Sequence, residues 1–188
     1  MNLAHRWLCN SNCWRTIVEK RLMPWALEGL ELGTDVLEIG PGPGITTAQL
    51  HAFVPNLTCV EVDEAYASSL SSRMMGESVR VLCGDGAVMP LPDASFDAVV
   101  CFTMLHHVGS IALQDQLLSE AARVLRSGGI FAGVDNVSSP LFRILHLFDT
   151  MVAIDPGVFP KRLSTAGFEK IHVDVVPNAF RFRAQKPA

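Results

Sequence analysis

The sequence predicts an α/β fold with a doubly wound, mostly parallel sheet of about seven strands and helices on both faces. From residue 35 onward, short apolar runs alternate with helix-like segments, the order that builds a parallel sheet between two helical layers. The runs are continuously apolar, as is typical of parallel strands buried on both faces. Only Pro177 and Asn178 separate the last two runs, which predicts a closing antiparallel hairpin.

Seven strands and five helices are predicted in this part of the chain. The strands are expected at 35–39, 57–62, 79–83, 97–102, 129–135, 170–176 and 179–185. The helices are expected at 45–53, 64–75, 111–126, 140–152 and 160–166. Three polar residues are positioned to cap helices, namely Asp63, Ser110 and Ser139. Pro140 suits a first helical position, and Gly167 suits the residue after a helix end.

Residues 1–33 precede the sheet and are expected to form a helical extension, with one domain over 34–188. Asn12 is the expected N-cap, and Pro24 should end or kink the helix before a second one at 25–30, stopped by Gly33. Packing on the domain edge is favoured over a lid above a ligand or a surface for a lipophilic substrate. The apolar stripe that predicts the first helix consists of Trp14, Ile17, Val18, Leu22 and Trp25.

The stretch 36–44 carries the strongest functional signal. An apolar run contains Glu38, and glycines follow at the alternate positions 40, 42 and 44. A second apolar run then ends at Glu61, which gives a strand–glycine loop–helix–strand unit of the kind that cradles nucleoside-bearing cofactors. The glycines bring the backbone close to the ligand, and the acid on the second strand suits ribose hydroxyls.

This loop differs from the dinucleotide-binding fingerprint G-x-G-x-x-G. Its third glycine comes one position early, so Ile45 stands where the fingerprint requires glycine. Pyrophosphate is held by backbone amides at a helix N-terminus, and prolines at 41 and 43 remove two of them. Glu38 is unfavourable beside phosphate but favourable beside a cation. The loop therefore indicates a cofactor without a diphosphate.

The segment Glu38–Gly44 resembles the first motif of class I S-adenosylmethionine (SAM)-dependent methyltransferases. Four further segments match the family in order: 60–63 after the second strand, 84–87 after the third, 91–102 leading into the fourth, and 123–129 leading into the fifth. The resemblance covers roughly residues 34–136. It is strongest to methyltransferases of type 11, the group that includes enzymes of ubiquinone and menaquinone biosynthesis, and it implies a Rossmann-like fold.

The resemblance implies that SAM is the cofactor and assigns its contacts residue by residue. Glu38 corresponds to the acid near the amino-acid end of SAM, which often acts through water. Glu61, with Val62 beside it, corresponds to the acid that binds the ribose, whereas Asp63 is expected only to cap a helix. The remaining cofactor-binding positions are Gly40, Gly42 and Gly44 in the loop, Asp85, Gly86 and Ala87 at the adenine, and Thr103 near the methyl group.

Catalysis by such an enzyme rests mainly on alignment, because the sulfonium of SAM already activates the methyl group. His106 and His107 follow the fourth strand, which in this architecture places them beside the methyl group. One of them can serve as the general base, or both can only pack and hydrogen-bond; the sequence leaves this open. Asp135 and Asn136 are positioned to reach the substrate, and His146 is expected to be structural.

Composition narrows the classes of partner. The net charge is −4, which argues against a general nucleic-acid grip, and the segment 101–106 lacks the element of methyltransferases that act on nucleic-acid bases. No apolar run approaches the ~18 residues of a membrane span, although peripheral membrane contact stays open. There is no secretion signal pattern, and the five cysteines, an odd number without a C-x-x-C pair, read as reduced thiols. We therefore expect a cytoplasmic protein.

The expected function is methyl transfer from SAM to a small or lipophilic acceptor, without a metal. Two alternatives remain. A non-catalytic SAM-binding regulatory or scaffold module would carry the same cofactor motif. An NAD-dependent oxidoreductase is less favoured, because it needs glycine at position 45 and usually a larger catalytic part. The acceptor, the atom methylated and the oligomeric state are not determined by the sequence.

Overall fold

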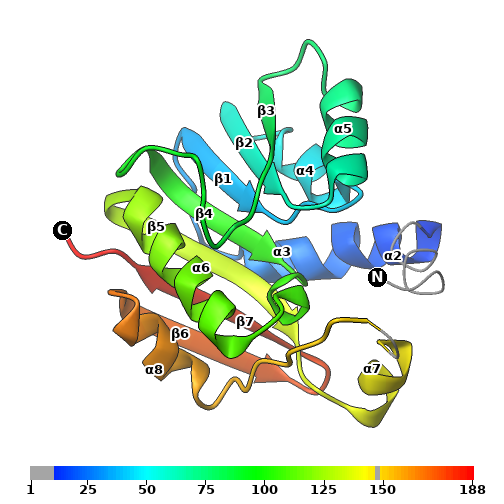
Figure 1. Ribbon diagram of the computed structural model, residues 1–188, viewed down its shortest axis with the longest axis vertical. Coiled ribbons are helices and arrows are strands. Elements are labelled where there is room, and N and C mark those ends of the chain that lie inside the picture. Colours follow the sequence, from blue (N-terminus) through cyan, green and yellow to red (C-terminus); the bar gives the residue numbers. More distant parts are fainter. Residues whose placement is uncertain (1–10, 147–148) are drawn as a thin grey trace.

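The computed structural model describes residues 11–146 and 149–188 and confirms the predicted fold. Its sheet has the order β3-β2-β1-β4-β5-β7-β6, with β7 antiparallel to both of its neighbours (Figure 1). The strands are β1 (Asp35–Ile39), β2 (Asn56–Glu61), β3 (Val79–Cys83), β4 (Phe96–Phe102), β5 (Leu125–Asn136), β6 (Glu169–Val176) and β7 (Ala179–Gln185). The helices after β1 are α4 (Ile45–Leu50), α5 (Glu64–Arg73), η2 (Leu105–His107), α6 (Ile111–Val124), α7 (Pro140–Leu145) and α8 (Phe159–Thr165).

Alternation along the strands divides the core between the two faces of the sheet. Val36 of β1 and Val100 of β4 belong to the cluster that packs under α4 and α5. Leu37 and Val99, one residue away, belong to the cluster with α6 and α8 on the opposite face. The same alternation turns Glu38 toward α4, since it lies two residues from Val36 on the strand.

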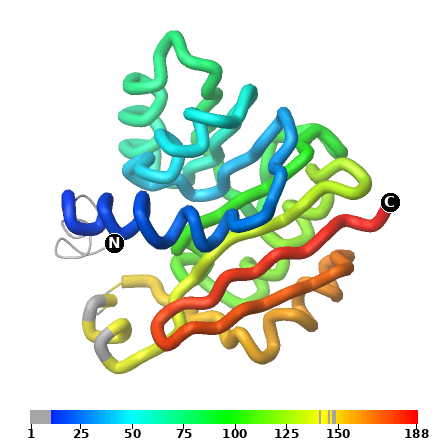
Figure 2. The backbone as a smooth tube through the Cα atoms, turned by 180° about the vertical axis from the view of Figure 1, so that it is seen from behind, coloured from blue at the N-terminus to red at the C-terminus, as the bar shows by residue number. Residues whose placement is uncertain are grey.

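The N-terminal helical run packs across the face that carries α4, as Figure 2 shows from behind. It comprises α2 (Asn12–Ile17), the π-helical segment η1 (Val18–Leu22) and α3 (Met23–Ala26). As expected, a second helix, α3, starts beside Pro24, which lies in its first turn, where proline is tolerated. This helix is shorter than the expected 25–30, because a turn follows Ala26.

The π-helical segment also explains why the predicted apolar stripe is only partly correct. The wider π turn shifts the inward position from Leu22 to Met23, so that Val18, Met23 and Ala26 are buried. Ile17, predicted to face inward, is 41% exposed. A helix-period reading cannot anticipate this shift because it assumes 3.6 residues per turn throughout.

The predicted caps Asp63, Ser110 and Ser139 are confirmed, since each side chain accepts a hydrogen bond from the first turn of its helix. At the N-terminus the cap is Ser11 rather than Asn12. The Ser11 hydroxyl accepts the bond from the Trp14 amide, and Asn12 is the first helical residue.

Two predicted boundaries are wrong in ways that matter for the site. Strand β5 begins at Leu125 rather than 129, because Leu125 already pairs with Phe96 across a bulge. The helix expected over 140–152 ends at Leu145. The chain instead packs against η2 and α6, where Val152 N–H donates to His106 O (2.8 Å) and Val152 O accepts from Gln114 Nε2 (2.8 Å).

The cysteines within the described ranges, at 13, 59, 83 and 101, are free thiols, and Cys9 lies outside those ranges. Cys59 and Cys101 are buried, which raises the pKa of both thiols by desolvation. Cys83 is exposed, because β3 is an edge of the sheet. Over residues 11–146 and 149–188, no helix combines the length and the apolar character needed to cross a bilayer.

A single arginine holds the loop between β3 and β4, which contains no helix. Arg123 of α6 donates five hydrogen bonds: two to Glu120, one to Asp93, and one each to the carbonyls of Leu91 and Met89. Glu120 in turn accepts from the Met89 amide (2.8 Å). Arg123, paired with Glu120 through two hydrogen bonds, therefore fixes the part of this loop from Met89 to Asp93.

We predict that Arg123→Ala lowers the free energy of unfolding by about 2 kcal/mol, because several charge-assisted hydrogen bonds are lost at a partly exposed site. Urea denaturation measures the change. Arg80→Ala, on the exposed edge strand, is the control and should stay within about 0.5 kcal/mol of the original protein. An equal effect of the two substitutions would contradict the clamp.

Candidate active site

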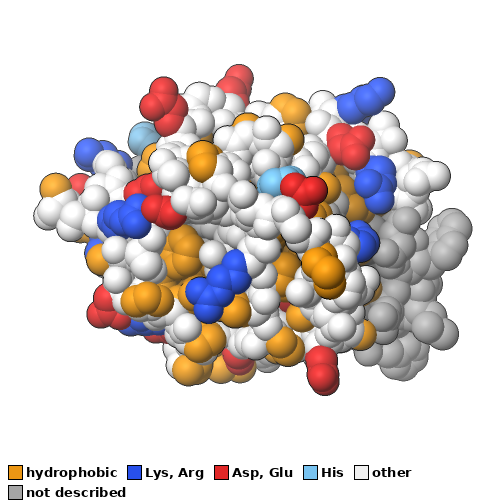
Figure 3. All heavy atoms as spheres, turned by 90° about the horizontal axis from the view of Figure 1, so that it is seen from above, with side chains coloured by type: hydrophobic (Ala, Val, Ile, Leu, Met, Phe, Trp, Pro, Cys, Tyr) orange, Lys and Arg blue, Asp and Glu red, His pale blue; other side chains and the backbone are white. Residues whose placement is uncertain are grey.

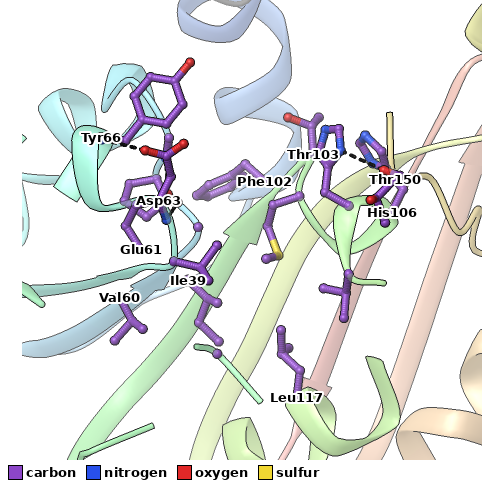
Figure 4. Close-up of a pocket in the computed structure, with 18 of the residues that line it drawn as sticks. Ile39, Val60, Glu61, Asp63, Tyr66, Phe102, Thr103, His106, Leu117 and Thr150 are labelled. Atoms are coloured by element: carbon purple, nitrogen blue, oxygen red, sulfur yellow. Dashed lines mark hydrogen bonds between the residues drawn. The ribbon is translucent and has the colours of Figure 1, made fainter. Parts of the chain in front are cut away.

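A cavity of about 530 Å³ opens at the carboxyl ends of β1, β2 and β4. It lies where the strand order reverses between β1 and β4, the position at which open α/β sheets bind ligands. Figure 4 shows Glu61, Asp63 and Tyr66 at one end, Thr103, His106 and Thr150 at the other, and Ile39 and Phe102 between them. The cavity thus joins an acidic end to a histidine end.

The backbone amides of the three loop glycines are already hydrogen-bonded to acceptors of the protein itself. Gly40 N–H donates to Val60 O (2.9 Å), and Gly44 N–H donates to Pro41 O (2.9 Å). Gly42 N–H donates to Glu61 Oε2 (2.8 Å), and the two prolines carry no N–H. Since a diphosphate needs amide donors, residues 40–44 are poorly suited to one.

Glu61 is the acid that faces the cavity. Its side chain is 5% exposed, and besides Gly42 it accepts from Asp63 N–H at 2.9 Å through the other oxygen. Each carboxylate oxygen has a second lone pair, so both can still accept from ligand hydroxyls. Asp63 also lines the cavity, but one of its oxygens already accepts two amides of α5.

The three loop glycines have different surroundings although all have positive φ. Gly40 and Gly42 line the cavity, and a Cβ on Gly42 would meet nothing within 4 Å. Gly44 lies behind the lining, where a Cβ would come within 2.5 Å of Leu70 Cδ1. Gly44 therefore permits α4 to pack on α5, and its contact with a cofactor stays a prediction.

The segment after β3 contributes Asp85 and Gly86 to the lining, and Val62 contributes from the end of β2. Ala87 is buried behind the lining, and its amide donates to Asp85 Oδ1 at 2.8 Å. The turn therefore holds the Asp85 carboxylate in place. The predicted roles of these residues at the adenine are not tested by this geometry.

Glu38 lies beneath the loop rather than in the cavity wall. It is 1% exposed, and its carboxylate accepts from the hydroxyls of Thr46 and Thr47, the latter at 2.6 Å. Burial raises the pKa of the Glu38 carboxyl, and the two threonine hydrogen bonds oppose that shift only in part. Because Thr46 lines the cavity, it connects Glu38 to the ligand space.

Thr103 lies at the end of β4 with φ of 49°, an unfavourable conformation for a β-branched residue. Its amide donates to Val134 O of β5 at 2.8 Å, which holds the end of β4 against β5. Its neighbours Phe102 and Met104 also line the cavity. Local strain of this kind is frequent at functional sites.

The histidine end is built on a buried pair. His106 is 2% exposed, and its Nδ1 lies 2.5 Å from Oδ1 of Asp135, which is fully buried. Asp135 also accepts from the amides of His106 (3.2 Å) and Asn136 (2.6 Å). His107 and Asn136 line the same end of the cavity, so the structure brings together the residues predicted to face the acceptor.

Several lining residues were not expected from the sequence. His146, predicted to be structural, lines the cavity together with Phe142 and Thr150. Trp14 reaches the rim from α2, so the N-terminal run both packs on the sheet and borders the cavity. The spacing of Phe142 and His146, four residues apart, was the available signal for one face of a helix.

Positive and negative side chains are interspersed on the face that Figure 3 presents, viewed from above. Arginines at the opposite, amino ends of the strands are also paired with acids. Arg126 donates to Asp97 and to Asp35, where the Asp35–Nη1 distance is 2.9 Å. Amide hydrogen bonds, with that from Asp35 foremost, lower the pKa of Asp97.

Comparison with known proteins identifies the family. The family model described as a methyltransferase domain matches residues 37–133. A probable S-adenosylmethionine-dependent methyltransferase of Mycolicibacterium smegmatis is 37% identical over 146 residues, which are 73% of this chain and 52% of that protein. The chain therefore spans about half the length of the curated relatives it matches.

Solved structures agree on the fold. A SAM-dependent methyltransferase from Aquifex aeolicus superimposes with a TM-score of 0.75 at 18% identity, covering 98% of both chains. Phosphoethanolamine N-methyltransferase 2 of Haemonchus contortus, solved with S-adenosyl-L-methionine, gives a TM-score of 0.77 at 16% identity, covering 98% of this chain and 56% of that one. Taken with the match of the domain model to just over half of the sequence, these findings mean that the chain belongs to the class I SAM-dependent methyltransferases.

Proposed function

We propose that this protein transfers the methyl group of SAM to a small or lipophilic acceptor. The proposal rests on one cavity that has Glu61, an acid suited to ribose hydroxyls, at one end and His106 at the other. The acceptor's lone pair attacks the methyl carbon in line with the C–S bond. The electron pair of that bond passes to sulfur and leaves S-adenosylhomocysteine. Alignment of the reacting atoms supplies most of the rate.

We propose that SAM binds at the acidic end of the cavity. Glu61 accepts hydrogen bonds from the ribose hydroxyls, and Val62 lies beside the ribose. Asp85, Gly86 and Ala87 surround the adenine. Gly40 and Gly42 let the chain approach the cofactor, Gly44 sets the helix behind them, and Thr103 borders the methyl group. Glu38 favours the cationic end of SAM through Thr46 or water, because a buried carboxylate attracts positive charge more strongly than an exposed one.

The acceptor end is proposed to select an uncharged or apolar molecule. Its support is a wall of aromatic and aliphatic side chains, namely Trp14, Phe102, Met104, Val108, Leu113 and Phe142. His106 or His107 accepts the acceptor's proton where one must be lost. A cytoplasmic location, and an acceptor that is not nucleic acid, are part of the same proposal.

A non-catalytic SAM-binding module is the second candidate, and one experiment separates the two. The protein is incubated with SAM labelled at the methyl group together with a metabolite and lipid extract. Under the proposal, label appears in a small organic product and S-adenosylhomocysteine accumulates with it. Tight SAM binding with no labelled product from any extract fraction would favour the binding module.

We predict that SAM and S-adenosylhomocysteine bind and NAD does not, because the amides of residues 40–44 are absent or already used. Isothermal calorimetry measures the binding of each compound, and NAD binding without SAM binding would reverse the cofactor assignment.

Glu61→Ala should weaken SAM binding about 10- to 100-fold through the loss of charge-assisted hydrogen bonds to the ribose. Asp63→Ala is the matched control and should have a smaller effect. Calorimetry compares the SAM affinities of the two variants, and equal losses would remove the ribose assignment.

We predict that Glu38→Gln raises stability relative to the original protein as pH rises but lowers the affinity for SAM. The folded pKa of Glu38 lies above its unfolded value of ~4.3, so the original protein loses stability as pH rises through that interval. Glutamine does not titrate. The melting temperature of Glu38→Gln minus that of the original should therefore increase as the pH is raised from below ~4.3 to neutral pH without cofactor, while SAM affinity falls. A difference independent of pH would mean that the two states share one pKa.

We predict that His106→Ala and His107→Ala leave SAM affinity nearly unchanged but slow turnover if the histidine handles the acceptor's proton. A general base contributes about 10²- to 10⁴-fold, so the responsible residue should show a loss in that range in kcat. His172→Ala, on the exposed surface of β6, is the control. Full activity in both active-site variants would restrict the two histidines to packing.

A further inference from the structure

Three histidines from two separate segments meet at the acceptor end of the cavity. His106 and His107 lie in η2, and His146 ends α7. One ring nitrogen of each lies within 4.8 Å of one from each of the other two. The ring centroids are 4.1 Å apart for His106–His107, 5.1 Å for His106–His146 and 5.3 Å for His107–His146. All three residues line the cavity.

The hydrogen bonds given for these rings favour the tautomer with the proton on Nδ1. His146 Nδ1 lies 2.7 Å from Phe142 O, and His107 Nδ1 lies 3.4 Å from Thr150 O. A carbonyl oxygen can only accept, so both Nδ1 atoms carry the proton. His106 Nδ1 donates in the same way to Asp135 at 2.5 Å. In a neutral ring of this tautomer the lone pair is on Nε2.

This arrangement is that of metal-binding histidines. A histidine that binds a metal through one nitrogen almost always donates its other N–H to a carboxylate or a backbone carbonyl, which fixes the ring and raises its basicity. Here one ring has a carboxylate partner and two have carbonyl partners. Phe142 packs edge-on against His106, with centroids 5.0 Å apart, and in a tilted arrangement against His146 at 4.2 Å, so an apolar ring screens the cluster.

We propose that His106, His107 and His146 bind one divalent transition-metal ion of the Zn²⁺ class through their Nε2 atoms, with an open coordination position toward the cavity. Three imidazole ligands suit Zn²⁺ and its neighbours, whereas Mg²⁺ and Ca²⁺ require oxygen. Tetrahedral coordination at ~2.1 Å brings the ligand nitrogens to about 3.4 Å from one another. Small rotations of the rings complete the site when the ion enters.

The role of the ion rests on the proposed function. A hydroxyl or thiol of the acceptor at the open position loses its proton to solvent more readily, because the metal stabilises the resulting anion. Its lone pair then takes the methyl group, and the C–S bonding pair stays with sulfur. The metal is neither oxidised nor reduced. In the loaded protein His106 is a ligand and not the base, since one lone pair cannot serve both purposes.

Metal binding is tested on tag-free, full-length protein treated with EDTA and then desalted. Zn²⁺ is titrated in competition with a chromogenic chelator, and Co²⁺ binding is followed by its visible absorption. We expect one ion per chain. His146→Ala should weaken Zn²⁺ binding more than 100-fold, and Asp135→Asn about 10- to 100-fold through loss of the orienting partner. His172→Ala, a histidine on the exposed surface of β6, should bind as the original does.

Binding of S-adenosylhomocysteine by calorimetry is measured on every variant and reports whether the cofactor end is folded. His107→Ala, at a half-buried position, provides a second ligand deletion should His146→Ala fail to fold. Loss of Zn²⁺ with S-adenosylhomocysteine binding retained supports the metal site. Absence of Zn²⁺ and Co²⁺ binding, or equal affinity in the ligand deletions and His172→Ala, overturns it. Zn²⁺ binding without any SAM binding would keep the metal site and refute the proposed function.

Discussion

The hydrogen bond from Gly42 N–H to Glu61 is the constraint on which the site depends, because it joins the loop after β1 to the end of β2. It needs glycine at 42, where φ is 52°. It also commits the amide that a phosphate would otherwise use. The flanking prolines then limit the loop to one shape. One contact thereby fixes the position of an acid and removes the donors that a dinucleotide requires.

The sheet fixes the position of Glu61 relative to the histidine end of the cavity. β1 pairs with β2 on one side and with β4 on the other, and β4 pairs with β5. Glu61 and the His106–Asp135 pair thus stand at the ends of strands in one hydrogen-bonded ladder. A transfer that works by alignment needs such fixed separations, since small displacements of the reacting atoms lower the rate steeply. The strained Thr103 lies at the histidine end, directly after the last residue of β4.

The sequence was sufficient for the parts of the structure governed by local signals. The alternation of strands and helices, the closing hairpin and three helix caps follow from apolar periodicity, turn residues and capping side chains. The sequence did not predict the π-helical shift before Met23, because the preference for burying Met23 over Leu22 arises only against α4 and the sheet. It also missed the end of α7 at Leu145, since Val152 pairs with His106, a residue 46 positions away in the chain. His146, the C-cap of that shorter helix, lines the cavity.

The buried His106–Asp135 pair also bears on whether the chain is a catalyst or a binding module. Burying a carboxylate and an imidazole together costs desolvation that an apolar pair of similar size would avoid. The pair lies away from the end of the cavity that we propose to bind SAM, and a module that only bound the cofactor would gain stability from replacing it. A polar, fully hydrogen-bonded pair buried at the other end therefore supports the catalytic proposal, in which His106 takes the acceptor's proton or holds a metal beside it.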